Sequence, residues 1–375
     1  MQGKDKDMNF QLYIPTRIVS GDNCLQKYAE LLRLGRHALL VTGKMSARRS
    51  GVLDDLIPIL TGAGIYVTVF DQITENPLLE TCYAGGQLAA RCGADFVIGI
   101  GGGSPIDAAK AIASFAANPQ MQMLDLFEAE KRVRPSLPIV AIPTTAGTGT
   151  EANPYSIMTL PDHERKKTYS APDSWARVAF LDPKYTATLS VAYTLSTALD
   201  AFAHALESYL SPKSTDLSEM MALYAARKIW RVIGDEPAVY DMDMRRELMA
   251  AACAAGIAIS VTGTGFPHPL GYSITMLDGI PHGAACALFD GDYLEYNERT
   301  DIGREKLARF YNYIGADGET LKKALPRLSG VKLSFTEEEI DRRVRLISGA
   351  KNYVNSPYVL SVEEMYEIYR KHFLK

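Results

Sequence analysis

The first half of the chain alternates between short apolar segments and longer amphipathic ones. Runs rich in β-branched residues occupy positions 37–42, 65–70, 96–100, 139–142 and 178–181. Segments in which apolar residues recur with helical spacing lie between several of these runs, for example at 77–91 and 105–117. Strands that alternate with helices predict an α/β fold with a parallel sheet, and uninterrupted apolar runs are typical of strands buried on both faces.

The pattern changes after Asp182 and Pro183. Six stretches with helical periodicity follow, at 194–210, 217–232, 245–259, 302–313, 336–349 and 362–373, and no pair of strand-like runs remains. We therefore expect an α/β domain over residues 1–183 and an all-helical domain over residues 184–375. The cleft between two such domains is a usual place for an active site.

Composition and charge narrow the class of protein. The chain has 375 residues, of which 47% are apolar and 22% charged, and its formal net charge is −4. The sequence has no long basic block of the kind that would favour binding to nucleic acid or to an anionic membrane surface. No apolar run reaches the roughly 18 residues of a membrane span. Residues 1–7 are rich in charge and lack the apolar core of a signal peptide, so we expect a cytoplasmic protein.

The five cysteines are scattered along the chain, and none of them forms a CxxC pair. Isolated cysteines in odd number are typical of reduced thiols in a cytosolic protein, and they argue against a cysteine zinc site. These residues are Cys24, Cys82, Cys92, Cys253 and Cys286.

A glycine-rich segment joins the predicted strand at 96–100 to the predicted helix at 105–117. It contains Gly101, Gly102 and Gly103, followed by Ser104 and Pro105. Glycines allow backbone amides to approach a phosphate closely, and the N-terminus of the following helix favours negative charge. The segment fits a pyrophosphate, although it does not match GxGxxG. A tight turn without a ligand remains the alternative for this segment taken alone.

A second polar loop follows the apolar run at 139–142. It offers hydroxyls from Thr144, Thr145, Thr148 and Thr150, together with two glycines. Taken alone, it is better explained as a loop that hydrogen-bonds to its own backbone. Two such loops at the carboxyl ends of neighbouring parallel strands favour nucleotide binding, because ligands of α/β sheets bind at that edge.

The helical half contains a candidate metal site. Asp200 and His204 are four residues apart in a predicted helix, which places them on one face. His268 and His282 follow in segments flanked by proline and glycine, which suit the end of an element better than a helix interior. One carboxylate and three imidazoles suit Fe(II) or Zn(II). Each histidine taken alone is better explained as a hydrogen-bonded, semi-buried residue, and the pair Asp200 and His204 taken alone as a hydrogen bond on a helix surface. The joint pattern, in a chain with two phosphate-type loops, favours the metal site.

Together, these motifs resemble the iron-containing (group III) alcohol dehydrogenases. The resemblance extends over nearly the whole chain and includes the glycine segment through Asp107, the threonine loop through Glu151, and the pair Asp182-Pro183. It also includes Asp200 with His204, and two later histidines 14 positions apart. The family implies a Rossmann-like N-terminal domain and a helical C-terminal domain, an architecture shared with dehydroquinate synthase.

The resemblance implies roles for individual residues. Gly102, Gly103 and Ser104 would bind the pyrophosphate, and Asp107 would lie beside the cofactor. Thr144, Thr145 and Thr148 would line the nicotinamide side, and Lys166 or Lys167 would approach the ribose or phosphates. Asp200, His204, His268 and His282 would hold the metal. Each role is carried over by matching positions in this sequence.

The first departure from the family pattern concerns proton transfer. Many relatives carry a further histidine four residues after the third metal ligand, and this chain has Tyr272 there. A tyrosine donates a hydrogen bond but is a poorer proton carrier at neutral pH. The proton relay would then run through water or a ribose hydroxyl. Simple core packing of Tyr272 is the alternative.

The second departure concerns the choice of cofactor. Many NAD-preferring relatives have an aspartate after the strand at 37–42, where this chain has Gly43, followed by Lys44, Ser46, Arg48 and Arg49. Loss of a carboxylate together with added cations and a hydroxyl favours a 2′-phosphate. We therefore expect NADP(H) in preference to NAD(H), with a solvated basic face as the alternative.

The resemblance implies an NAD(P)-dependent enzyme that transfers hydride between the cofactor and a small primary alcohol or aldehyde. Within the superfamily, a polyol dehydrogenase of the glycerol type and a lyase resembling dehydroquinate synthase remain alternatives, as does a non-catalytic protein that kept the fold. We expect a small-molecule substrate and a homodimer or larger homo-oligomer, with no nucleic-acid or membrane partner.

Overall fold

The N-terminal half is built around one parallel sheet. The computed structural model describes residues 10–162 and 165–375, so the charged segment at 1–7 lies outside the described part. Six strands pair in parallel in the order β1–β8–β5–β4–β2–β3. The predicted α/β fold with a parallel sheet is confirmed. The strands are β1 (Arg17–Ser20), β2 (His37–Gly43), β3 (Tyr66–Ile73), β4 (Phe96–Gly101), β5 (Ile139–Pro143) and β8 (Val178–Leu181).

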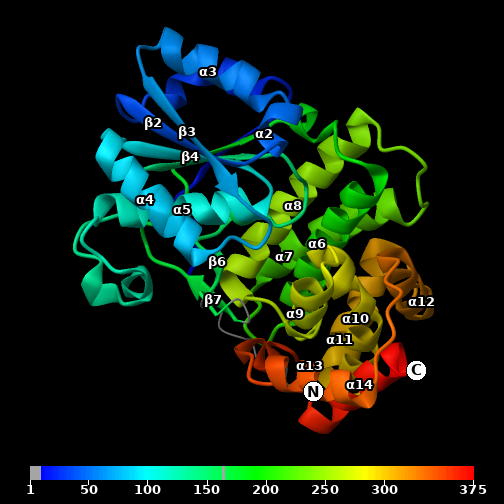
Figure 1. Cartoon of the computed structure of the whole chain (residues 1–375). Helices are drawn as coiled ribbons and strands as arrows, with labels where there is room; N and C mark the ends of the chain where they lie inside the picture. The colour runs from blue at the N-terminus through cyan, green and yellow to red at the C-terminus, as the bar shows by residue number, and fades with distance from the viewer. Residues whose placement is uncertain (1–9, 163–164) are drawn as a thin grey trace.

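Helices cover both faces of this sheet (Figure 1). One face packs against α1 (Cys24–Lys27), α2 (Ser46–Arg49) and α3 (Val52–Gly62), and the other packs against α4 (Leu79–Cys92) and α5 (Gly103–Ala117). Successive residues of β2 alternate between the two faces, so Leu39 and Leu40 belong to different cores and both are fully buried. Burial on both faces explains why the strands are uninterrupted apolar runs.

The pattern of apolar residues did not predict three strands. β1 lies at the edge of the sheet and is only half-buried. The other two, β6 (Ser156–Thr159) and β7 (Lys166–Tyr169), form a separate antiparallel hairpin. β7 begins with two lysines, so it lacks the buried apolar run that marks the central strands.

The second half of the described chain is helical, as predicted. Three of its helices, α9, α10 and α12, were not predicted because their sequences contain proline or glycine. α9 begins with Pro267, which is well tolerated in a first helical turn. The helices are α6 (Val191–Leu210), α7 (Asp216–Ile233), α8 (Met242–Thr262), α9 (Pro267–Asp278), α10 (His282–Asn297), α11 (Asp301–Ile314), α12 (Gly318–Ser329), α13 (Glu337–Ile347) and α14 (Val362–Phe373).

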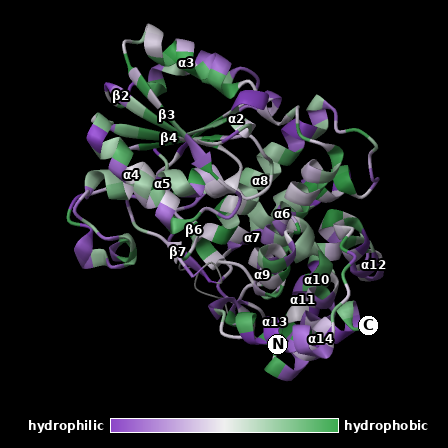
Figure 2. Ribbon diagram, viewed as in Figure 1, coloured by the Kyte–Doolittle hydropathy of each residue, from purple (hydrophilic) through white to green (hydrophobic). Residues whose placement is uncertain are grey.

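The most buried helices of this half are α6 and α10, which pack against each other. Figure 2 shows hydrophobic residues concentrated on the strands and the inner helices, whereas hydrophilic residues predominate on α12 and α14. The other helices of this half thus surround α6 and α10, two buried helices that also carry polar side chains. Within the described residues, no single helix has the length and apolar composition needed to cross a membrane, and the one pair that passes jointly is bent by 113°.

Candidate metal centre and nucleotide-binding cleft

The glycine segment turns directly into a helix at the edge of the sheet. β4 ends at Gly101, and α5 begins at Gly103 with Gly102 as its N-cap. Gly102, Gly103 and Ser104 all line a cavity that extends to the helical half. The positive end of the α5 dipole and the free amides of its first turn therefore face a space in which an anion can bind.

The threonine loop packs directly against this turn. A Cβ atom on Gly103 would lie 2.7 Å from Thr148 Cγ2, so only glycine fits there without a shift. Thr145 and Thr148 line the cavity, as expected. Thr144 is buried and is not among the lining residues, whereas Thr150, to which the family resemblance gave no individual role, is one of them.

A buried polar network joins the two loops. Thr150 Oγ1 donates to Asp107 Oδ1 at 2.5 Å, and the Asp107 Oδ2 atom accepts the Ile157 amide at 2.9 Å. The ammonium of Lys110 donates to the carbonyl and hydroxyl of Thr150 at 2.8 and 2.6 Å. Asp107 does line the cavity, but its carboxylate is engaged in fixing the geometry of both loops.

Of the two lysines considered for cofactor binding, only Lys166 lines the cavity. Its Nζ donates to the side-chain oxygen Asn76 Oδ1 at 2.8 Å. The backbone N–H of Asn76 in turn donates to Ser104 Oγ at 3.1 Å. Lys167 is exposed, and its ammonium lies 4.3 Å from the centre of the Phe127 ring. Alternation along β7 therefore directs the two neighbouring lysines to opposite sides.

The four expected metal ligands converge at the helical side of the cavity. Asp200 and His204 lie one turn apart on α6, whereas His268 is in the first turn of α9 and His282 is the first residue of α10. Both late histidines thus occupy element ends, as their flanking prolines and glycines indicated. Asp200 Oδ1 lies 3.9 Å from His204 Nε2, 3.8 Å from His268 Nε2 and 3.9 Å from His282 Nε2.

These separations fit a cation between the four side chains. Each exceeds hydrogen-bond range, and the buried atoms Asp200 Oδ1 and His268 Nε2 have no hydrogen-bond partner among residues 10–162 and 165–375. Ligand atoms that each lie about 2.0–2.2 Å from one ion are separated from one another by distances similar to those between Asp200 Oδ1 and the three histidine nitrogens. Burial of such atoms without a partner is costly, and an ion would satisfy them together.

Burial also keeps the imidazoles in the form that binds metals. It lowers the pKa of His268 to about 4 and the pKa of His282 to about 3. Both rings are therefore neutral at pH 7, with a lone pair available on one nitrogen. Neutral imidazole is the form that coordinates a metal ion.

Glu207, which no sequence pattern singled out, contacts His268 on the side that faces away from the candidate metal site. It is fully buried on α6, and its Oε1 lies 2.7 Å from His268 Nδ1. Its Oε2 accepts the Gly265 amide at 2.5 Å. A carboxylate that binds the far nitrogen of a histidine fixes the ring orientation and makes it a better ligand. Its spacing of three residues from His204, in an otherwise apolar helix, was a usable signal.

Cys286 also lies beside the cluster. It follows His282 by one turn of α10, and its sulfur is 3.8 Å from His282 Nε2. One candidate ligand set in the described chain combines it with Asp200, His268 and His282. The sulfur is nearly equidistant from both nitrogens of the His282 ring, so it lies alongside the ring rather than beyond Nε2, where an ion would lie.

Tyr272 lies in the wall of the same cavity. Its ring stacks on that of His282, with centroids 5.9 Å apart and an interplanar angle of 21°. The ammonium of Lys166 lies 5.5 Å from the centre of the Tyr272 ring. Burial raises the pKa of Tyr272, so the phenol stays protonated across the physiological pH range.

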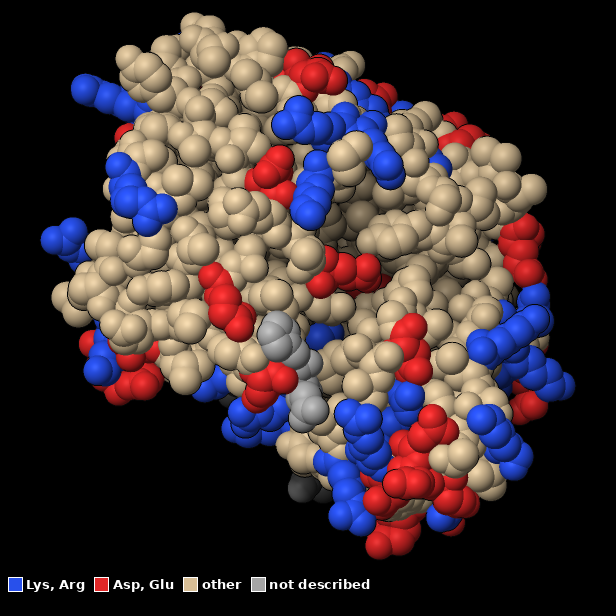
Figure 3. Space-filling model, in the orientation of Figure 1, with Lys and Arg blue, Asp and Glu red and all other residues tan. Residues whose placement is uncertain are grey.

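Gly43 and Ser46, which were expected to bind the cofactor, are not among the described residues that line this cavity. They lie at the carboxyl end of β2, which pairs in parallel with β4. Gly43 ends this strand, and Ser46 begins α2. A Cβ atom on Gly43 would lie 3.2 Å from the Ile73 carbonyl oxygen and 3.4 Å from Ser46 Oγ, so the position is narrow. Figure 3 shows a hollow between the two halves, with Lys and Arg side chains gathered above it.

The helix N-terminus in this cavity suits the pyrophosphate of a dinucleotide, and the aspartate with three histidines suits a catalytic metal ion. Comparison with known proteins agrees. Residues 15–183 match the family described as iron-containing alcohol dehydrogenase, and residues 194–373 match the C-terminal part of the same family. The chain belongs to the iron-containing alcohol dehydrogenase family.

Individual relatives are similar over most of their length. An NADPH-dependent butanol dehydrogenase from Clostridium saccharobutylicum is 28% identical, covering 91% of this chain and 86% of its own. The crystal structure of an iron-containing alcohol dehydrogenase from Thermotoga maritima has a TM-score of 0.89 at 36% identity, covering 97% and 99%. A sulfoacetaldehyde reductase from Bifidobacterium kashiwanohense, solved in complex with NAD+, has a TM-score of 0.85 at 26% identity, covering 97% and 98%.

Membership of this family makes the chain an oxidoreductase of the alcohol dehydrogenase class. It implies an iron-type metal centre and a nicotinamide cofactor.

Proposed function

We propose that this enzyme reduces small aldehydes to primary alcohols, and oxidises the alcohols in reverse, with NADP(H) as the preferred cofactor. The observation that carries the proposal is the convergence of three histidine Nε2 atoms within 3.9 Å of Asp200 Oδ1 in the wall of the nucleotide cleft. Four ligands in this arrangement suit Fe(II) or Zn(II).

The bound groups supply the reactive chemistry. An ion held by Asp200, His204, His268 and His282 would act as a Lewis acid towards the substrate oxygen, and the nicotinamide would give or accept hydride. The protein orients both partners. The amides at Gly102 and Gly103 bind the pyrophosphate, and Thr145 and Thr148 position the nicotinamide end.

The character of the cavity favours a small uncharged substrate. Lys166 is the one lysine or arginine among the described residues that line it. Close to the metal cluster, the wall contains the apolar side chains Ile259, Tyr272 and Pro281, with Thr264 and Asn352 as polar neighbours. A substrate carrying both carboxylate and phosphate, as a dehydroquinate synthase-like lyase requires, would find Lys166 as its one cationic side chain among the described lining residues.

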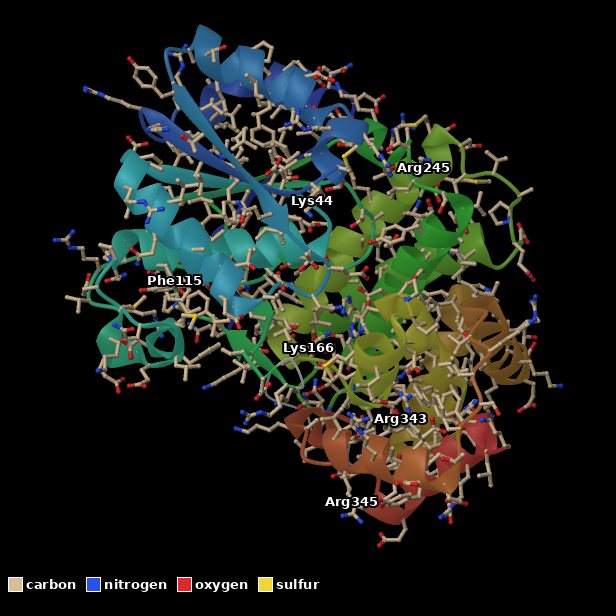
Figure 4. All side chains as sticks on the ribbon, viewed as in Figure 1. Lys44, Phe115, Lys166, Arg245, Arg343 and Arg345 are labelled. Carbon is tan, nitrogen blue, oxygen red and sulfur yellow. The ribbon has the colours of Figure 1, made fainter. Side chains whose placement is uncertain are left out.

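The preference for NADP(H) rests on the carboxyl end of β2. Gly43 leaves no carboxylate to repel a 2′-phosphate, and the narrow space at its Cβ position disfavours a larger residue. Ser46 offers a hydroxyl, and Lys44 lies on the adjoining loop (Figure 4). Relatives include both an NADPH-dependent enzyme and one solved with NAD+, so the argument depends on these residues of the chain itself.

The decisive assay follows the absorbance of reduced nicotinamide with Fe(II)-loaded enzyme, NADPH or NADH, and a series of aldehydes. We expect NADPH oxidation that stops on addition of a chelator and resumes on readdition of metal. Oxidation of NADH alone would refute the cofactor preference. Turnover only with polyols would shift the substrate class to the glycerol type, and a product formed without net cofactor change would indicate a lyase.

A further inference from the structure

Tyr272 lies in the wall of the cavity and carries a phenol, which is a poor proton carrier near pH 7. An alcohol dehydrogenase nevertheless must supply one proton to each molecule of aldehyde that it reduces. The same cavity therefore needs another group that can supply the proton.

We propose that Lys166 is the catalytic acid and base of this enzyme, held in place by Asn76 and by the ring of Tyr272. The proposal rests on the proposed reductase function. It assigns to Lys166 the transfer of a proton to the substrate oxygen, beyond the contact with ribose or phosphate that the resemblance implies.

The geometry of Lys166 suits this role. Its Nζ donates to Asn76 Oδ1 at 2.8 Å and lies 5.5 Å from the centre of the Tyr272 ring. Tyr272 in turn stacks on His282 of the metal cluster. Figure 4 shows Lys166 between the α/β half and the helical half. An ammonium has three N–H bonds, and Asn76 is its one hydrogen-bond acceptor within residues 10–162 and 165–375, so other N–H bonds are free to face the cavity.

Asn76 is itself held in an uncommon backbone conformation. Its φ angle is 55°, in the left-handed region, and its amide donates to Ser104 Oγ while its carbonyl accepts from Thr159 Oγ1 at 3.4 Å. These contacts tie one residue to the glycine turn and to the β6–β7 hairpin. The Lys166 ammonium is therefore fixed relative to both the nucleotide end and the metal end of the cleft.

The environment also prepares Lys166 for proton exchange. Burial lowers its pKa to about 8, against weaker opposing effects from nearby acidic groups. A divalent cation in the neighbouring cluster would lower the pKa further, because like charges disfavour the ammonium. Such a value is close to the optimum for acid–base catalysis near neutral pH. The titratable groups that face it are Glu75, Asp107, Asp200, His268, Tyr272, His282 and Cys286.

The step balances as follows in the direction of reduction. Hydride passes from the nicotinamide to the carbonyl carbon, and the carbonyl electron pair moves to the oxygen. An Nζ–H bond of Lys166 breaks as its proton passes to that oxygen, which gives the alcohol. The neutral amine then regains a proton from solvent. Oxidation of the alcohol is the reverse, with the neutral amine as base.

Three variants separate proton transfer from cofactor binding. Lys166→Met removes the proton donor, and Lys166→Arg keeps the positive charge but cannot release a proton at these pH values. Lys167→Met is the matched control, because that neighbouring side chain lies outside the cavity. For each, kcat is measured against pH, and the Kd for NADPH is measured separately by fluorescence titration without substrate.

We expect both Lys166 variants to lose on the order of 10²-fold or more in kcat, which is typical for removal of a general acid. The Lys166→Arg variant should keep an NADPH affinity close to that of the wild type. In the wild type, kcat for reduction should fall as pH rises through the pKa of Lys166, and this limb should vanish in Lys166→Met. A fourth variant, Lys166→Ala, leaves space for a small primary amine in place of the lysine side chain. Addition of such an amine should restore part of the turnover of this variant.

Two results would overturn the inference while leaving the reductase function intact. The first is a normal kcat and pH profile in Lys166→Arg, with only the Kd for NADPH changed in Lys166→Met, which would make Lys166 a cofactor ligand alone. The second is a loss of the pH limb in Tyr272→Phe, which would assign the proton to the phenol. Absence of turnover in the wild type, by contrast, would refute the proposed function itself.

Discussion

Glu207 Oε1 lies 2.7 Å from His268 Nδ1, on the side of the imidazole that faces away from Asp200. The contact directs the other nitrogen, Nε2, towards the cluster, where it has no partner within the described part of the chain. With Nε2 free as a ligand, Nδ1 carries the proton and donates it to the carboxylate. The orientation of one proposed metal ligand is therefore fixed by a residue outside the proposed ligand set.

This contact predicts a metal-affinity defect at a distance from the ion. Burial raises the pKa of Glu207 well above its ordinary value, although His204 and the bond from the Gly265 amide oppose this shift. Glu207→Gln keeps the size of the side chain but removes the carboxyl group that pairs with His268 Nδ1, so His268 becomes a weaker and less well-oriented ligand. We expect metal affinity, measured by competition with a chromogenic chelator, to fall by about 10–100-fold. Glu295→Gln, at a half-exposed position of α10, is the control and should bind as the wild type does. Unchanged affinity in Glu207→Gln would show that the contact has no influence on the metal.

The narrow space at Gly43, at the carboxyl end of β2, predicts a switch of cofactor. Gly43→Asp should repel the 2′-phosphate of NADPH and offer NADH a partner for its ribose hydroxyl. We expect the ratio of kcat/KM for NADPH over NADH to fall by about tenfold or more, which corresponds to roughly 1.4 kcal/mol. Gly43→Asn has nearly the same size and meets the same Ile73 oxygen, so it isolates the effect of charge. An equal fall in both variants would mean that space, not charge, governs the preference.

A close backbone approach between the two halves predicts a stability effect. Gly149 follows Thr148 in the threonine loop with φ of 60°, and a Cβ atom on Gly256 of α8 would lie 2.3 Å from the Gly149 carbonyl oxygen. Gly256→Ala should therefore move the loop, destabilise the protein by about 1–3 kcal/mol and weaken NADPH binding.

Gly62→Ala is the matched control, because its Cβ atom meets nothing within 4 Å and α3 would gain a better helix former. Thermal unfolding and NADPH titration of both variants test the prediction. Equal melting temperatures for Gly256→Ala and the wild type would contradict it.

A buried carboxylate predicts that acid loosens the C-terminal helix. Asp292 of α10 is bonded by His372 Nε2 at 2.7 Å and by Lys371 Nζ at 2.8 Å, both from α14. Burial alone would raise the pKa of Asp292, but the bonds and charges of His372 and Lys371 outweigh it and hold that pKa below its ordinary value. A depressed carboxyl pKa stabilises the fold above the unfolded-state pKa, near 4, and this stability is lost as pH falls through the folded-state pKa.

The free energy of unfolding should therefore decline below about pH 4 in the wild type. Asp292→Asn should be less stable at pH 7, by on the order of 1–3 kcal/mol, and its stability should depend less on pH in the acid range. Urea unfolding at pH 7 and pH 3 gives both quantities. A variant that kept the full acid dependence of the wild type would assign that dependence to other carboxylates.

The sequence predicted the order and type of the secondary-structure elements better than the tertiary contacts between them. The apolar runs of β2, β4 and β5 indicated a buried parallel sheet because each strand is covered on both faces. The spacing of Asp200 and His204 placed both on one helical face. Their meeting with His268 and His282 depends on how three helices pack, and spacing along the chain carries no information about that packing.

The residues that could not be predicted from the sequence are those whose roles depend on contacts with distant parts of the chain. Asn76 has no motif around it, and only the fold brings it to Ser104 and Lys166. The hairpin that presents Lys166 was not predicted, because its strands are short and polar. The sequence could name this lysine as a candidate but could not distinguish it from Lys167, since that distinction depends on strand register.

The most direct test of the central claim is a count of bound metal combined with a count of bound cofactor. Wild-type protein and the His268→Ala and His282→Ala variants would be reconstituted with Fe(II) or Zn(II), desalted, analysed for metal by mass spectrometry and titrated with NADPH. We predict one ion per chain in the wild type and little or none in either variant, with NADPH still bound by all three and turnover lost in both variants. Full metal content and activity in either variant would contradict the assignment of these histidines as the metal ligands.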